Sequence, residues 1–171
     1  GMLLGVSAEV KPRLAVLDEW APKAGTDAQL SAGLRGWLAT RDPEMWRRPD
    51  WIFVDPSAAS FKLQLFHDGL SNVANGNNDV LPGIRAIASL LSTRQLIVAE
   101  RCKHLIRNIP GYSWDPKTTA RGIDAPLKVD DHEADALRYA IYSSRAQWRG
   151  LVPVSTAADD APGANREEVA A

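Results

Sequence analysis

The sequence predicts an α/β fold in which a mixed β-sheet is flanked by helices. Two apolar runs, residues 2–9 and 13–20, are joined by a short connection containing a proline, which predicts a β-hairpin. Two further short runs, residues 51–54 and 95–99, are apolar at almost every position, as in strands buried on both faces of a sheet. Because helical segments alternate with these runs, we expect antiparallel strands at one edge and parallel strands reached through crossover helices.

The helices are indicated by apolar residues at helical spacing and by residues that start or stop a helix. Residues 71–79 are rich in turn formers and residues 112–128 are irregular, so neither segment is assigned a helix or strand. Asp18 and Glu19 end the second apolar run, where solvated acids are ordinary. The predicted helices cover residues 26–40, 58–69, 101–109 and 131–148, with a further helix opened by Pro82.

Length and composition predict one globular domain. The chain has 171 residues, of which 45% are hydrophobic, enough for a substantial core. We assign residues 1–150 to this domain and the small, polar residues 151–171 to a flexible tail. The single cysteine, Cys102, excludes an internal disulfide and is expected to be a small buried hydrophobe. The formal net charge is −1, so nucleic acid would bind only through a local basic patch, and no apolar run is long enough to span a bilayer.

Asp55 directly follows the apolar run at residues 51–54. In open α/β sheets, ligands bind at the carboxyl ends of the strands, so this position suits a ligand-binding acid. Pro56 stops the strand and suits the first turn of a helix, so Asp55 is also placed to cap that helix. Position alone favours the capping role.

A second acidic group lies at the start of the helix predicted over residues 131–148. Asp131 and Asp135 are four residues apart and His132 and Asp135 are three apart, so these side chains project from neighbouring surface. Acids at a helix start also complement the helix dipole. When this acidic group is considered alone, that structural role is favoured over metal binding. Arg138, one turn further on, is placed to pair with an acid of this group or to contact phosphate, and the pairing suits its position better.

Asp55 and the helix acids together favour a metal site. Carboxylates converging from separate elements suit Mg²⁺ or Mn²⁺, and two such ions can promote phosphodiester hydrolysis. His132 would then be a ligand, a proton carrier or a hydrogen-bond partner of Asp135. No cysteine pair or second nearby histidine suggests zinc, and no Walker A loop is present.

Basic residues lie between the last apolar run and the acidic helix. Scattered basic residues most often form a solvated face, but beside a nuclease site they would be placed to bind the DNA backbone. The residues we expect to bind DNA are Lys117, Arg121 and Lys128.

Several strings of the chain, taken in order, resemble the C-terminal nuclease domain of the terminase large subunit of tailed bacteriophages. The resemblance extends from the first hairpin to about Tyr142 and is most specific in its last string; the strings are residues 54–60, 83–85, 100–102, 111–115 and 130–139. It implies an RNase H-like fold and a metal-dependent endonuclease that cuts concatemeric double-stranded DNA during genome packaging in the cytoplasm of the bacterial host. The implied partners are DNA, the terminase ATPase domain, the small terminase subunit and the portal.

The resemblance also implies roles for individual residues. Asp55, His132 and Asp135 match the catalytic positions, and Asp55, Asp131 and Asp135 match the ligands of a two-metal site that takes Mg²⁺ or Mn²⁺. In that family a further metal-binding aspartate lies on a central strand before the hairpin, and neither that strand nor the ATPase domain is in this sequence. We therefore expect an N-terminally truncated domain with weak or no cleavage.

Two other functions remain open. The first is a non-catalytic packaging module that binds DNA or the portal without cutting, and the absent aspartate favours it. The second is another RNase H-like nuclease such as a resolvase, which Trp114 and the string at residues 130–139 disfavour.

Overall fold

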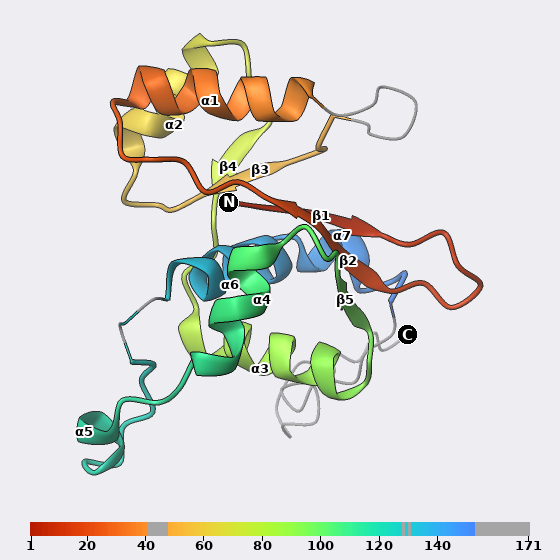
Figure 1. Ribbon diagram of the computed structural model, residues 1–171, viewed down its shortest axis with the longest axis vertical. Helices are drawn as coiled ribbons and strands as arrows, with labels where there is room; N and C mark the ends of the chain where they lie inside the picture. Colours follow the sequence, from red (N-terminus) through yellow and green to blue (C-terminus); the bar gives the residue numbers. More distant parts are fainter. Residues whose placement is uncertain (41–47, 128, 130, 153–171) are drawn as a thin grey trace, which may run out of the picture.

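A computed structural model describes residues 1–40, 48–127, 129 and 131–152, and Figure 1 shows how its elements are arranged. Its strands form two small sheets. In the first, β1 (Met2–Val6) is antiparallel to β2 (Leu14–Glu19), and β2 is parallel to β5 (Leu96–Val98). In the second, β3 (Ile52–Val54) is parallel to β4 (Val73–Asn75).

Helices lie on both sides of these strands. The helices α1 and α2 pack together beside β3 and β4, whereas α3, α4 and α6 lie together on the other side of β1 and β2, next to β5, in Figure 1. Helix α6 contacts both β1 and β3 and so links the two sheets. The helices are α1 (Asp27–Ala39), α2 (Ala59–His67), α3 (Val80–Ser92), α4 (Lys103–Asn108), α5 (Pro116–Thr119), α6 (His132–Ser143) and α7 (Arg145–Trp148), with a 3₁₀ turn, η1 (Ile109–Gly111), after α4.

The predicted class, a mixed sheet flanked by helices, is confirmed, as are the hairpin and the parallel pairing of the later strand. Three expectations were wrong. The described strands form two sheets rather than one, and β4 lies in the turn-rich segment 71–79. Strand β3 is half-buried rather than buried on both faces, and Trp51 before it is 50% exposed. The reason is that, among the described strands, β3 pairs with β4 alone, so its apolar residues are not enclosed as in a central strand.

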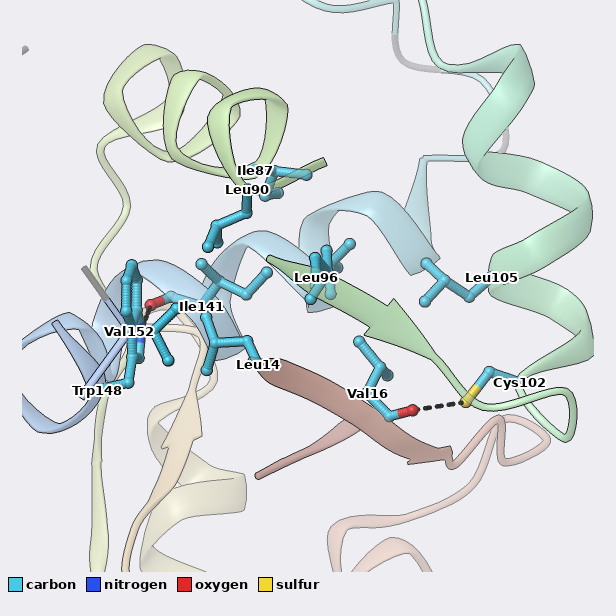
Figure 2. Packing of buried hydrophobic residues seen from close by; sticks show 11 residues of the cluster. Leu14, Val16, Ile87, Leu90, Leu96, Cys102, Leu105, Ile141, Trp148 and Val152 are labelled. Atoms are coloured by element: carbon cyan, nitrogen blue, oxygen red, sulfur yellow. Dashed lines mark hydrogen bonds between the residues drawn. The ribbon is translucent and has the colours of Figure 1, made fainter. Parts of the chain in front are cut away.

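The main core lies between β2, β5 and helices α3, α4 and α6 (Figure 2). Leu14 and Val16 of β2 point into it, and Leu137 and Ile141 of α6 meet them, all at most 1% exposed. The ring nitrogen of Trp148 donates a hydrogen bond to the Ile141 carbonyl at 2.8 Å, which fixes α7 against the end of α6. Helix α6 therefore presents one face to this core and leaves another for the site described below.

Three further expectations concern the ends of elements and of the chain. Asp18, at the end of β2, is only 8% exposed, so it is not a solvated acid. The helix predicted over residues 131–148 is divided at Ser144, whose hydroxyl donates to the Ala140 carbonyl. Of the predicted tail, Leu151 is 55% exposed and Val152 is fully buried in the core, while residues 153–171 lie outside the described residues. No helix in the described ranges is long and apolar enough to cross a membrane.

Candidate functional site

Asp55 lies just beyond β3, and three hydrogen bonds fix its carboxylate. Its Oδ1 accepts the backbone N–H of Ser57 at 2.8 Å and the Ser57 hydroxyl at 2.6 Å. Its Oδ2 accepts the hydroxyl of Tyr139 at 2.8 Å. The Ser57 hydroxyl, then the Ser57 N–H and the Tyr139 hydroxyl, lower the pKa of Asp55 below its ordinary value. The side chain therefore closes a turn and faces α6; it does not cap α2, whose preceding residue Ala58 has no side-chain cap.

One face of α6 carries a row of polar residues spaced four apart. Asp131 immediately precedes the helix, and Asp135, Tyr139 and Ser143 follow at successive turns. Tyr139 reaches Asp55, and the Ser143 hydroxyl accepts the backbone N–H of Asn77 at 2.8 Å. The row thus lies along the end of β3 and the loop after β4. The fold brings Asp55 to the same helix face as Asp131 and Asp135, although these acids are distant in sequence.

Arg138 pairs with Asp135, as the sequence predicted. Its Nε and Nη2 donate to Oδ1 of Asp135 at 3.3 and 3.2 Å, and the residue is only 2% exposed. Its guanidinium carbon lies 4.6 Å from the centre of the Tyr139 ring, a cation–π contact. The third nitrogen, Nη1, is buried and has no hydrogen-bond partner in the described part of the chain.

The sequence did not reveal several residues that build this site. Lys62 donates to the Pro56 carbonyl at 2.8 Å and to Oδ1 of Asn75 at 2.6 Å, which ties the turn after β3 to the end of β4. The Tyr139 hydroxyl also lies 2.9 Å from Oδ1 of Asn78; since a phenol has one proton, the charged carboxylate of Asp55 is the stronger acceptor. For Tyr139 a signal was available, because it stands four residues after Asp135.

The remaining predicted residues do not gather at Asp55. His132 is exposed at the first position of α6. Lys117 and Arg121 are exposed on and just after α5, which stands apart from the ends of β3 and β4 in Figure 1. Lys128 and Asp130 lie outside the described residues.

The segment predicted to be irregular is a short hairpin with α5 at its tip. Trp114 bridges to Pro126, the Asp115 N–H donates to the Ala125 carbonyl at 2.9 Å, and the Leu127 N–H donates to the Ser113 carbonyl at 2.8 Å. We call residues 113–127 the α5 arm. It presents Lys117 and Arg121 to solvent at a distance from the acids.

The acids fit Mg²⁺ or Mn²⁺ in donor type, because both ions prefer carboxylate oxygens. An ionised carboxylate offers about four lone-pair sites, and the Ser57 and Tyr139 hydrogen bonds occupy three of those on Asp55. One site on Oδ2 is left for a cation. In the described ranges, however, no three His, Cys, Asp or Glu side chains come close enough together to hold an ion. Asp55 and the α6 acids therefore supply part of a ligand set.

Comparison with known proteins relates this chain to phage large terminases. No family model matches the chain. The terminase large subunit of Escherichia phage T5 is 30% identical over 131 residues, which cover 75% of this chain and 28% of that protein. The large terminase of a thermophilic bacteriophage matches in two crystal forms, with TM-scores of 0.71 and 0.72 and 30% identity in each, over 85% of this chain and 36% and 35% of the chains in those crystals.

The same thermophilic phage terminase in complex with ATP-γ-S also matches, with a TM-score of 0.69 and 27% identity over 83% of this chain and 39% of that one. The chain thus spans between about a quarter and two-fifths of the length of these relatives. Both its sequence and its fold are similar to those of these terminases over most of its residues. The chain is a homologue of the phage terminase large subunit over most of its own length.

Proposed function

We propose that this chain is the DNA-cleaving module of a phage terminase large subunit, a metal-dependent endonuclease that cuts concatemeric double-stranded DNA during genome packaging. The observation that carries the proposal is the Asp55–Tyr139 hydrogen bond, which joins an acid at a strand end to the helix face bearing Asp131 and Asp135. Homology to large terminases supports the packaging role. In this proposal the ATPase domain, the small subunit and the portal are partners, and the host cytoplasm is the place of action.

The residues of this chain have distinct parts in the proposed reaction. Asp55, Asp131 and Asp135 would hold Mg²⁺ or Mn²⁺, which when bound activates water and stabilises the leaving oxygen. Ser57 orients Asp55. His132, exposed at the start of α6, is placed to carry a proton to or from solvent.

The α5 arm has a different role in this proposal: it binds DNA at a distance from the acids. Lys117 and Arg121 are exposed on it, and basic side chains bind the phosphate backbone without regard to sequence. A duplex lying across both the arm and the acids would contact the chain at two separated places.

Plasmid nicking tests the proposal. Supercoiled plasmid is incubated with the chain and Mn²⁺, and relaxed circles are measured over time. We expect slow, Mn²⁺-dependent nicking that is lost in Asp55→Asn and in Asp135→Asn. Asp50→Asn is the matched control, because Asp50 is an exposed acid five residues before Asp55. Nicking that is unaffected by Asp55→Asn would reject the assignment.

A second function, DNA or portal binding without cleavage, is favoured by one observation: in the described ranges the acids do not form a three-membered group. In this case the chain binds duplex DNA in the presence of EDTA and never nicks it. Removing Lys117 or Arg121 should then lower the slope of log affinity against log salt by about one. DNA binding with no nicking under Mn²⁺ would favour this function over the first.

A further inference from the structure

Two adjacent residues of α6, Arg138 and Tyr139, each hold one of the candidate metal ligands. Tyr139 donates to Oδ2 of Asp55 at 2.8 Å, and Arg138 donates from two nitrogens to Oδ1 of Asp135 at 3.3 and 3.2 Å. Adjacent residues on a helix normally point in different directions. Here, however, the guanidinium carbon lies 4.6 Å from the centre of the tyrosine ring. The two acids are therefore joined through one stacked pair of side chains.

Two glycines pack closely against this pair of side chains. A Cβ atom at Gly76 would come within 2.5 Å of Cδ1 of Tyr139, and one at Gly83 within 2.6 Å of Cγ of Arg138. Gly76 follows β4 and Gly83 lies in the first turns of α3. Backbone from two separate elements thus closes directly on the two side chains, which leaves them little freedom to change rotamer.

The burial of Arg138 is not explained by stability. The side chain is 3% exposed, while its partner Asp135 is 26% exposed, so the cation is much more buried than the anion. Its Nη1 is buried without a hydrogen-bond partner in the described part of the chain. An unsatisfied buried donor on a charged group destabilises a fold, whereas an apolar residue in its place would not have this cost. What Arg138 supplies in return is a fixed position for Asp135.

We propose that Arg138 and Tyr139 are positioning residues that hold Asp135 and Asp55 in the orientation needed to bind a divalent cation. The inference rests on the proposed function and adds which residues keep the ligands in place. Neither side chain is required to touch the cation or the DNA. Hydrogen-bond partners of metal ligands commonly change metal affinity about 10- to 100-fold when they are removed.

Manganese binding to the 171-residue chain, measured by electron paramagnetic resonance of free Mn²⁺, tests this inference without a cleavage assay. We expect Tyr139→Phe and Arg138→Lys each to weaken Mn²⁺ binding about tenfold. Tyr139→Phe removes only the hydroxyl, and Arg138→Lys keeps the charge but loses the planar fork and the stacking. Tyr142→Phe is the matched control, because Tyr142 is on the same helix but outside the Asp135–Tyr139–Ser143 row. Far-ultraviolet circular dichroism of each variant reports whether it folds.

A double variant separates positioning from other effects. If Tyr139 acts through Asp55, adding Tyr139→Phe to Asp55→Asn weakens Mn²⁺ binding no further. If Tyr139→Phe instead lowers the Mn²⁺ affinity of the Asp55→Asn variant by the full amount again, the inference is overturned. The inference is also overturned if Tyr139→Phe and Arg138→Lys bind Mn²⁺ as tightly as Tyr142→Phe does. If Asp55→Asn and Asp135→Asn still bind it weakly in that experiment, the proposed function survives. If Asp55→Asn and Asp135→Asn bind Mn²⁺ as the unchanged chain does, the proposed function fails and the inference fails with it.

Discussion

Glu19 caps helix α4 from the end of strand β2. Its Oε1 accepts the backbone N–H of His104 at 2.8 Å and its Oε2 accepts that of Leu105 at 2.9 Å, across 85 and 86 residues of sequence. These are the second and third residues of α4, whose N–H groups have no partner within the helix. One side chain therefore satisfies two backbone donors and places its negative charge at the positive end of the helix dipole.

Removing this cap should destabilise the whole domain. We expect Glu19→Ala to lower the free energy of unfolding by about 1–2 kcal/mol, the upper part of the range of helix N-cap losses, because two backbone donors lose their acceptor; urea unfolding measures this. Glu9→Ala is the control, because Glu9 forms an exposed ion pair with Arg13. It should change stability by less than about 1 kcal/mol. Equal losses in the two variants would contradict the capping role of Glu19.

The substitutions Gly83→Ala and Gly36→Ala should change the stability of the chain in opposite directions. A Cβ at Gly83 would lie 2.6 Å from Cγ of the buried Arg138, so Gly83→Ala overpacks the contact between α3 and α6 and should cost about 1–3 kcal/mol. A Cβ at Gly36 in helix α1 meets nothing within 4 Å. Gly36→Ala should therefore stabilise the chain by about 0.5–1 kcal/mol, because it removes freedom from the unfolded state. Thermal unfolding of both variants measures the difference, and a stabilising Gly83→Ala would contradict the packing described.

Asp68 should make the stability of the helix pair α1–α2 depend on pH. The Ser31 hydroxyl, then the Gln64 amide, hydrogen-bond to Oδ2 of Asp68 and lower its pKa. A folded-state pKa below the unfolded one, which is about 3.9, gives stability that is complete above that value and is lost as pH falls through the folded pKa. Asp68→Asn should therefore be less stable than the unchanged chain at pH 7 and should approach it below about pH 4.

Urea midpoints between pH 3 and pH 7 measure this dependence. Asp50→Asn, a change at an exposed acid, is the control and should run parallel to the unchanged chain. A constant difference between Asp68→Asn and the unchanged chain at every pH would contradict the assignment.

The sequence predicted what depends on local pattern and left out what depends on contacts between distant residues. The hairpin is indicated by two apolar runs joined by a short connection with a proline, and α6 by apolar residues at helical spacing. The Arg138–Asp135 pair lies within one helical turn, so all three were predicted. Strand β4 is three residues long in a turn-rich segment, and its pairing with β3 gives no local signal.

The candidate site divides in the same way. Asp55 was identified from its position after a strand, but its partner Tyr139 is 84 residues away, and no periodicity links them. For Asp18 the strand end suggested solvent, whereas the side chain is only 8% exposed in the fold, and nothing in the local pattern indicates this burial. The role of Asp131 and Asp135 as metal ligands stays a prediction.

Cys102 should be almost inert toward thiol reagents while the chain is folded. It is fully buried, its thiol donates a weak hydrogen bond to the Val16 carbonyl at 3.7 Å, and burial raises its pKa to about 11 (Figure 2). Because an ordinary thiol has a pKa of about 8.5, the thiolate fraction at pH 8 falls by more than about 100-fold, and reaction also requires the core to open. It is the only cysteine, so one labelling rate with a disulfide reagent, in buffer and in urea, measures this directly. Native labelling within about tenfold of the unfolded rate would mean that the contact between β2 and the start of α4 opens far more readily than its burial implies.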